Sequence, residues 1–165
     1  MSMTDKREKQ INLLQQNLRS IRQIVGWTTE RFGSEIGVTK QTISDLETIK
    51  RPMTLTQYLA IRSVFNDEIA NSPDNATAIH NAIDISVDKG AELDDEKNLE
   101  LKETLEATAA LATKGKKGEA LEKMLIALTT PAVVGALVAL GAMLFSSTGV
   151  GTAKITANAI KKIMK

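Results

Sequence analysis

The sequence predicts an all-α protein in three parts, and three observations support this prediction. Apolar residues recur at spacings of three, four and seven within the first 70 residues, which is the periodicity of an amphipathic helix. Glycine and threonine residues stand between the periodic stretches, at positions where helices end and begin. A stretch of 22 residues without any charge, 124–145, is long enough to form one further, apolar helix.

The first two helices are predicted over residues 12–25 and 29–35. Apolar side chains share one face of the first: Leu13, Leu14, Leu18, Ile21, Ile24 and Val25. Gly26 ends this helix, and Thr28 is a suitable N-cap for the second, whose Phe32 and Ile36 should face inward. We expect Trp27, between the two helices, to pack beneath the second.

Three more helices are predicted after the turn at Gly37. Thr39 is a natural N-cap for a helix over 40–47, whose buried side would carry Ile43 and Leu46. Residues 55–65 repeat apolar side chains at helical spacing after Pro52, and residues 76–85 predict a closing fifth helix. Short helices joined by a glycine turn indicate a bihelical unit.

The sequence from Thr28 to Glu47, TTERFGSEIGVTKQTISDLE, followed by KRP at 50–52, resembles the lambda-repressor-like helix-turn-helix family, the xenobiotic-response-element class. The resemblance extends from Leu13 to about Phe65, about a third of the chain. It implies a DNA-binding domain of four to five helices over residues 1–70. Gly33 departs from the family's usual alanine; both residues let the helices approach closely, but glycine costs roughly 1 kcal/mol of helix stability.

The resemblance also implies which residues read the bases of double-stranded DNA. The major groove admits one helix, whose N-terminal side chains reach the base edges. Lys40 and Gln41 are the leading candidates, with Ser44 and Asp45 one turn further along. Lysine can donate to guanine, glutamine pairs with adenine, and aspartate accepts from cytosine. Of the four, Asp45 is the weakest candidate, because phosphates repel a carboxylate.

Other residues are expected to bind phosphates and to position the domain. Thr29 lies at the start of the second predicted helix, and Thr42 is in the first turn of the third. Lys50 and Arg51 follow the third helix. Glu47 is expected to be structural and to bond to an arginine such as Arg19 or Arg22.

Charge is segregated along the chain. Residues 1–70 carry 10 Lys and Arg against 8 Asp and Glu, residues 71–113 carry 3 against 10, and residues 114–165 carry 8 against 2. This pattern predicts a head over 1–70, an acidic helical connector over 71–118, and a hydrophobic tail with basic residues over 119–165. The connector's acidic helix, 94–112, would be a dimerisation helix or a solvated stalk, with Leu99, Leu101, Leu105 and Leu111 on its apolar side.

The 22 residues from Met124 to Phe145 carry no charge, and the next charged residue is Lys154. As a helix these 22 residues would span roughly 33 Å, enough for a hydrocarbon core of about 30 Å. We therefore expect this stretch to cross a lipid bilayer once, as a transmembrane helix that anchors the chain. Two alternatives stay open: a buried helix in a soluble oligomer, and a segment that dips into the membrane and returns. In the second alternative Ile155, Ile160, Ile163 and Met164 would lie on anionic lipid.

These features predict a transcription regulator of a bacterium or phage, a repressor that occupies an operator as a homodimer or higher oligomer. Its head would be cytoplasmic and held at the cytoplasmic membrane. No catalysis, cofactor or metal is expected, because cysteine is absent and His80 is the only histidine. One rival is a membrane-anchored scaffold whose head binds a protein instead of DNA, and a second is a pore-forming tail fused to the head.

Overall fold

The computed structural model describes residues 2–113, and every regular element in this part of the chain is helical. The elements are α1 (Met3–Val25), α2 (Thr29–Ile36), α3 (Lys40–Glu47), α4 (Leu55–Asn71), α5 (Pro73–Ile83), a π-helical turn η1 (Asp84–Lys89), a 3-10 turn η2 (Gly90–Glu92) and α6 (Asp95–Thr113). The predicted all-α class is therefore confirmed for the described residues. The tail over 119–165, including the stretch 124–145, lies outside them.

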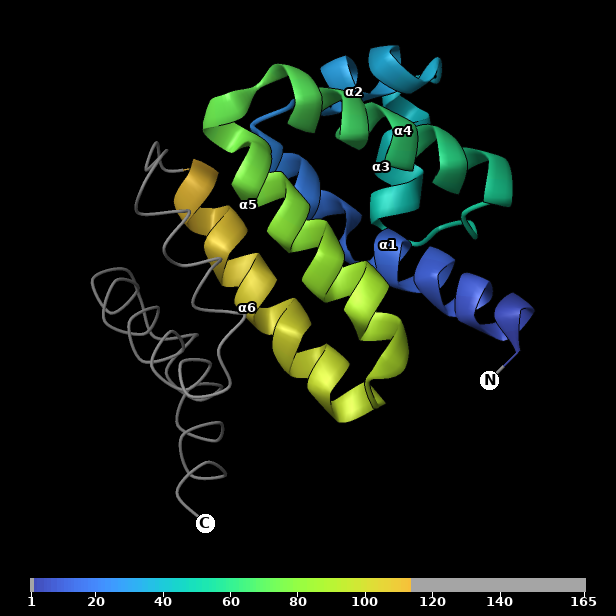
Figure 1. Ribbon diagram of the computed structural model, residues 1–165. Coiled ribbons are helices and arrows are strands. Elements are labelled where there is room, and N and C mark those ends of the chain that lie inside the picture. The colour runs from blue at the N-terminus through green and yellow to red at the C-terminus, as the bar shows by residue number, and fades with distance from the viewer. Residues whose placement is uncertain (1, 114–165) are drawn as a thin grey trace, which may run out of the picture.

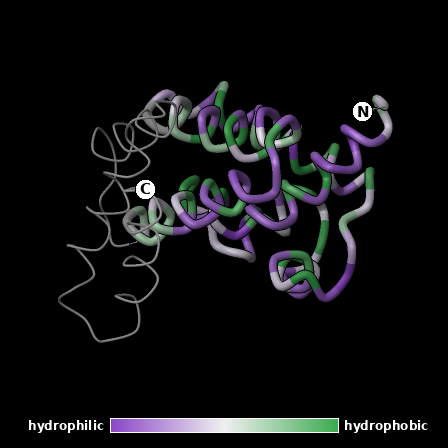
Figure 2. The backbone as a smooth tube through the Cα atoms, turned by 90° about the horizontal axis from the view of Figure 1, so that it is seen from below, coloured by the Kyte–Doolittle hydropathy of each residue, from purple (hydrophilic) through white to green (hydrophobic). Residues whose placement is uncertain are grey.

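Helix α1 is the central element of the fold. Helices α3 and α4 contact it, and α5, η1, η2 and α6 also pack against it. In Figure 1, α5 and α6 run alongside α1. Green and purple stretches alternate along the helices in Figure 2, as expected for elements with one apolar face. Helices on both sides of residue 70 thus contribute to one hydrophobic core.

The start of α1 differs from the prediction, because the helix begins at Met3 and not near residue 12. Ser2 and Asp5 form a capping box: the Ser2 Oγ accepts from the Asp5 backbone N–H at 3.2 Å, and the Asp5 carboxylate accepts from the Ser2 N–H at 3.0 Å. The helix ends as predicted at Gly26, whose φ of 81° is left-handed. The capped first turns are too polar to show apolar periodicity.

Helices α4 and α5 also differ from the predicted ranges. Helix α4 starts at Leu55, as predicted, after a capping box of Thr54 and Gln57, but it continues six residues beyond Phe65 to Asn71. Helix α5 begins earlier than predicted, at Pro73, and ends at Ile83. The following residues are wound as a π-helical turn, which buries Ile85 and Val87.

Helix α6 is acidic and helical as predicted, but it is not a solvated stalk. It packs along α1 and buries Thr104, Leu105, Thr108, Ala109 and Ala112. The two threonine hydroxyls donate to carbonyls one turn earlier in α6, at 2.8 and 2.9 Å, so they enter the interface without leaving an unpaired donor. Leu99, predicted on the apolar side, is 58% exposed.

Candidate nucleic-acid interface

Helices α2 and α3 are joined by a short turn that the sequence largely specifies. Thr28 caps α2 by accepting from the Arg31 N–H at 3.1 Å, and Thr39 caps α3 by accepting from the Thr42 N–H at 3.2 Å. Gly37 has a φ of 71°, a left-handed conformation that glycine adopts without strain. Both predicted caps and the predicted turn are confirmed.

Gly33 has a stricter role than the sequence indicated. A β-carbon at this position would lie 2.7 Å from the carbonyl oxygen of Val38 and 3.2 Å from the carbonyl carbon of Thr39. Both atoms are backbone, so they cannot move aside as a flexible side chain would. The glycine therefore lets α2 pack against the backbone that leads into α3.

The inner face of α3 is fixed in the core. Ile43 and Leu46 are fully buried, as predicted, and Phe32 of α2 is buried with them. Trp27 and Phe65 complete an aromatic cluster with Phe32, in which the ring centroids are 5.3 to 5.9 Å apart. The prediction that Trp27 packs beneath the second helix is therefore confirmed.

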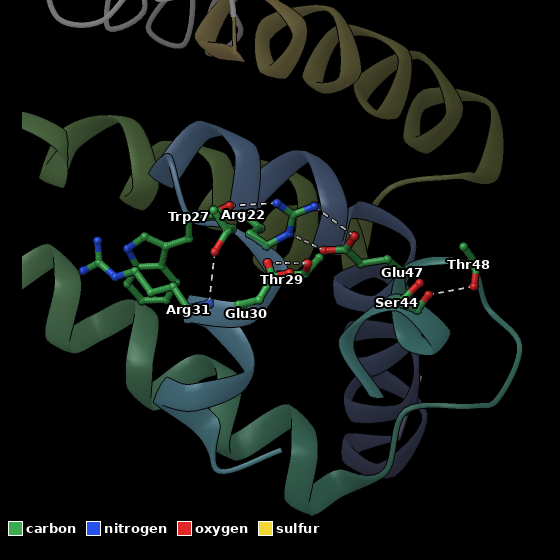
Figure 3. Close-up of polar contacts among 9 residues, drawn as sticks. Arg22, Trp27, Thr29, Glu30, Arg31, Ser44, Glu47 and Thr48 are labelled. Atoms are coloured by element: carbon green, nitrogen blue, oxygen red, sulfur yellow. Dashed lines mark hydrogen bonds and ion pairs between the residues drawn. The ribbon is translucent and has the colours of Figure 1, made fainter. Parts of the chain in front are cut away.

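Arg22 and Glu47 attach the C-terminal end of α3 to α1. The Arg22 Nε donates to Glu47 Oε1 at 2.5 Å and Nη2 donates to Oε2 at 3.0 Å, while Nη1 donates to the Trp27 carbonyl at 2.7 Å (Figure 3). Only 11% and 6% of the two side chains are exposed. Of the two arginines predicted as partners of Glu47, Arg22 is the one that binds it.

The four predicted base-contact residues lie on the side of α3 that the core leaves open. Lys40 and Gln41 are exposed in the first turn, and Ser44 and Asp45 are half-buried one turn later. Gln41 Nε2 donates to Asp45 Oδ1 at 2.8 Å. Asp45, the weakest of the four base-contact candidates, therefore accepts a hydrogen bond from Gln41, one of the two leading candidates.

Lys40 forms an ion pair with Glu30, which lies in the first turn of α2. This contact brings the first turns of α2 and α3 together. The hydrogen bond from the Lys40 ammonium, followed by hydrogen bonds within the first turn of α2, lowers the pKa of Glu30 to about 2. The Glu30 side chain is therefore a carboxylate at any physiological pH.

The predicted phosphate-binding residues lie at two places around α3. Thr29 is the first residue of α2, where its Oγ1 donates to Glu30 Oε2 at 3.1 Å, and Thr42 is in the first turn of α3. Lys50 and Arg51 are exposed in the connection to α4. Lys50 Nζ lies 3.6 Å from Asp45 Oδ1, so this connection returns toward the open side of α3.

Gln15 of α1 is a buried residue that the sequence did not identify, and it holds the connection after α3. Its Nε2 donates to the carbonyls of Leu46 at 3.1 Å and Arg51 at 2.7 Å, and its Oε1 accepts from the Met53 N–H at 2.8 Å. The sequence feature that could have indicated this buried role is a polar residue, Gln15, between the apolar Leu14 and Leu18 on a buried helix face. Gln15 therefore sets the path of the backbone that carries Lys50 and Arg51.

Ile49 is the one non-glycine residue among the described residues with a left-handed backbone, at a φ of 54°. It lies two residues after α3, and 56% of it is exposed. A β-branched side chain is strained in this conformation. The tight exit from α3 is thus held by the surrounding contacts and not by the local preference of the residue.

Comparison of the chain with protein-family models, curated proteins and solved structures finds no match. Between residues 2 and 113, every helix is too short or too polar to span a membrane. The predicted membrane segment, 124–145, is outside this range.

Proposed function

We propose that α2 and α3 form a helix-turn-helix unit of the lambda-repressor-like kind, that α3 enters the major groove of double-stranded DNA, and that the protein regulates transcription. The observation that carries this proposal is the two-sided character of α3. Ile43 and Leu46 fix one side in the core, and the first turn on the other side presents Lys40 and Gln41. A rigid helix with exposed polar residues at its N-terminus suits base-edge recognition.

The residues around α3 suit phosphate binding. Thr29 begins α2, where backbone N–H groups and the helix dipole favour an anion. Its hydroxyl donates to the Glu30 carboxylate in the free protein, so a phosphate bound by Thr29 would replace that carboxylate as the acceptor. Lys50 and Arg51 are exposed after α3, on a backbone segment that Gln15 anchors. Cations on a fixed backbone can position α3 in the groove without reading the sequence.

The modest charge of the head favours binding as a homodimer or higher oligomer. Residues 1–70 carry an excess of only two positive charges, and affinity for DNA rises with the number of phosphates neutralised. A second copy would double the contacts, and two copies of α3 about one turn of DNA apart would read paired half-sites.

The exposed polar residues favour DNA over a protein partner for this face. Lys40, Gln41, Lys50 and Arg51 are all exposed, whereas a protein-binding head would be expected to carry apolar or acidic residues at these positions. The scaffold alternative therefore predicts that the chain ignores duplex DNA even at low ionic strength.

The first experiment selects duplexes from a random pool with the full-length protein and measures affinities across a salt series. Gln41→Ala is expected to weaken binding to the selected duplex by about 1 to 3 kcal/mol and to relax the preference at one position, because it removes a base contact. Gln16→Ala is the matched control, since Gln16 is an exposed glutamine of α1. Equal losses on selected and random duplexes would reject base reading by Gln41.

A second comparison separates phosphate contacts from base contacts. Arg51→Ala is expected to weaken binding to all duplexes by a similar factor and to reduce the salt dependence by about one phosphate contact. A loss confined to the selected duplex would contradict this role.

The proposal also includes attachment of the chain to a bilayer through residues 124–145, which rests on the length and uncharged character of that stretch. The full chain is expected in the membrane fraction, and a chain without 124–145 is expected in the soluble fraction. Recovery of both chains in the soluble fraction would favour the alternative of a buried helix in an oligomer.

A further inference from the structure

The open side of α3 carries carboxylates beside its cations. Glu30 pairs with Lys40, and Asp45 lies near Lys50 and accepts from Gln41. The Lys40–Glu30 pair joins the first turn of α2 to the first turn of α3, and in the proposed complex both turns face the duplex. A carboxylate at this place repels the phosphates of DNA. The position of Glu30 beside Lys40 therefore affects which groups on DNA Lys40 can bind.

The Lys40–Glu30 pair is made and broken easily. The two side chains are 65% and 56% exposed, and ion pairs in contact with water contribute little stability. Glu30 is ionised at neutral pH, as any exposed glutamate is, and the neighbouring ammonium lowers its pKa further. Any group on DNA that binds Lys40 therefore meets a charged carboxylate that is already in contact with the same ammonium.

The Glu30 carboxylate affects the binding of Lys40 to guanine bases and the binding of Lys40 to phosphates differently. An ammonium has three donors, so Lys40 can bind guanine O6 and N7 and still donate to Glu30. These guanine atoms carry only partial negative charges, so they repel a carboxylate less than a phosphate does. A phosphate is charged, and a phosphate that binds Lys40 must approach Glu30 or displace it.

We propose that Glu30 is a specificity-determining residue, because its carboxylate penalises binding of Lys40 to phosphates more than binding of Lys40 to a base edge. This inference rests on the proposed DNA-binding function. In this role Glu30 weakens binding to random DNA and does not strengthen binding to the operator. Few of the sites that such a protein meets are operators, so weaker random binding increases useful selectivity.

The test compares Glu30→Gln with the unaltered full-length protein on the selected duplex and on a random duplex. The variant is expected to bind random duplex more tightly, and one more phosphate contact adds about 0.9 to the slope of log affinity against log salt. Between 50 and 200 mM salt, that slope corresponds to an extra loss of affinity of about 3.5-fold. Binding to the selected duplex should change less, so the ratio of the two affinities should fall.

Glu35→Gln is the matched control, since Glu35 is also an exposed acid of α2 but lies 3.7 Å from Arg31 and not beside Lys40. It should change both affinities by one common factor. If Glu30→Gln also changes both by a common factor, or changes neither, the proposal is wrong. Failure of the unaltered protein to bind any duplex would instead overturn the proposed function itself.

A second readout does not use DNA. The pKa of the Glu30 carboxyl, followed by carbon NMR, should be lower in the unaltered protein than in Lys40→Met, because the variant lacks the ammonium that donates to this carboxylate. Lys40 is exposed, so this variant is expected to fold. An unchanged pKa in Lys40→Met would show that the pair does not form, and it would overturn the inference.

Discussion

Glu47→Gln tests how α3 is held on α1. The change removes the negative charge that faces Arg22 while keeping the size of the side chain. Because the two side chains are only 11% and 6% exposed, the Arg22 guanidinium would remain buried without a counter-charge. Breaking a buried pair in this way costs about 3 to 5 kcal/mol, and the lower end is expected because the amide oxygen can still accept one hydrogen bond.

Removal of both charges should cost less than removal of one. In the double variant Arg22→Met with Glu47→Leu no charge is buried, and such replacements are often neutral or stabilising. The variant still loses the donor that Arg22 supplies to the Trp27 carbonyl at 2.7 Å, which costs about 1 kcal/mol. We therefore expect the double variant to be about 2 kcal/mol more stable than Glu47→Gln.

Urea unfolding followed by the fluorescence of Trp27 measures both variants. Trp27 is the sole tryptophan and is 4% exposed, so unfolding will change its environment strongly. With a urea dependence of about 2 kcal/mol per molar, Glu47→Gln should lower the midpoint by about 1.5 M. If the double variant is as unstable as Glu47→Gln, the cost does not come from an unpaired buried charge, and our reasoning is refuted.

Three further changes test the surroundings of α3. Gly33→Ala should lower the melting temperature by a few degrees. Overpacking against the Val38 carbonyl costs about 1 to 3 kcal/mol, whereas the higher helix propensity of alanine contributes only about 1 kcal/mol. A higher melting temperature would mean that the backbone of the turn moves to make room for the methyl group. Ile49→Asn should raise the free energy of unfolding by about 1 kcal/mol in urea titration, since asparagine tolerates a left-handed backbone, and a lower value would contradict the strain argument. Gln15→Leu should cost at least about 2 kcal/mol and accelerate hydrogen exchange of the Met53 amide, which loses its acceptor, whereas unchanged exchange would show that Gln15 does not hold this segment.

Local signals predicted the part of the fold around α3 well. Thr28, Gly37 and Thr39 mark caps and a turn within the chain itself, and the predicted bounds of α3 agree with the structure. Ile43 and Leu46 were assigned to the core by their spacing, and both are buried. Such features depend on neighbouring residues only, so a single sequence contains them.

Features that depend on distant residues were harder to predict. The face of α6 that meets α1 is built largely of threonine and alanine, whose small side chains permit close packing but give little hydrophobic periodicity. Leu99 carries a stronger apolar signal, yet it is exposed. The ion pair of Lys40 with Glu30 joins two helices, so no spacing within one helix indicated it.

The central place of α1 decides which piece of the chain is worth expressing. A fragment that stops at residue 70 would lack α5, η1, η2 and α6, all of which contact α1, and would present their contact surfaces to water. Newly exposed apolar surface of this kind promotes aggregation. A shortened protein for crystallisation or NMR should therefore retain the chain through Thr113, the last residue of α6.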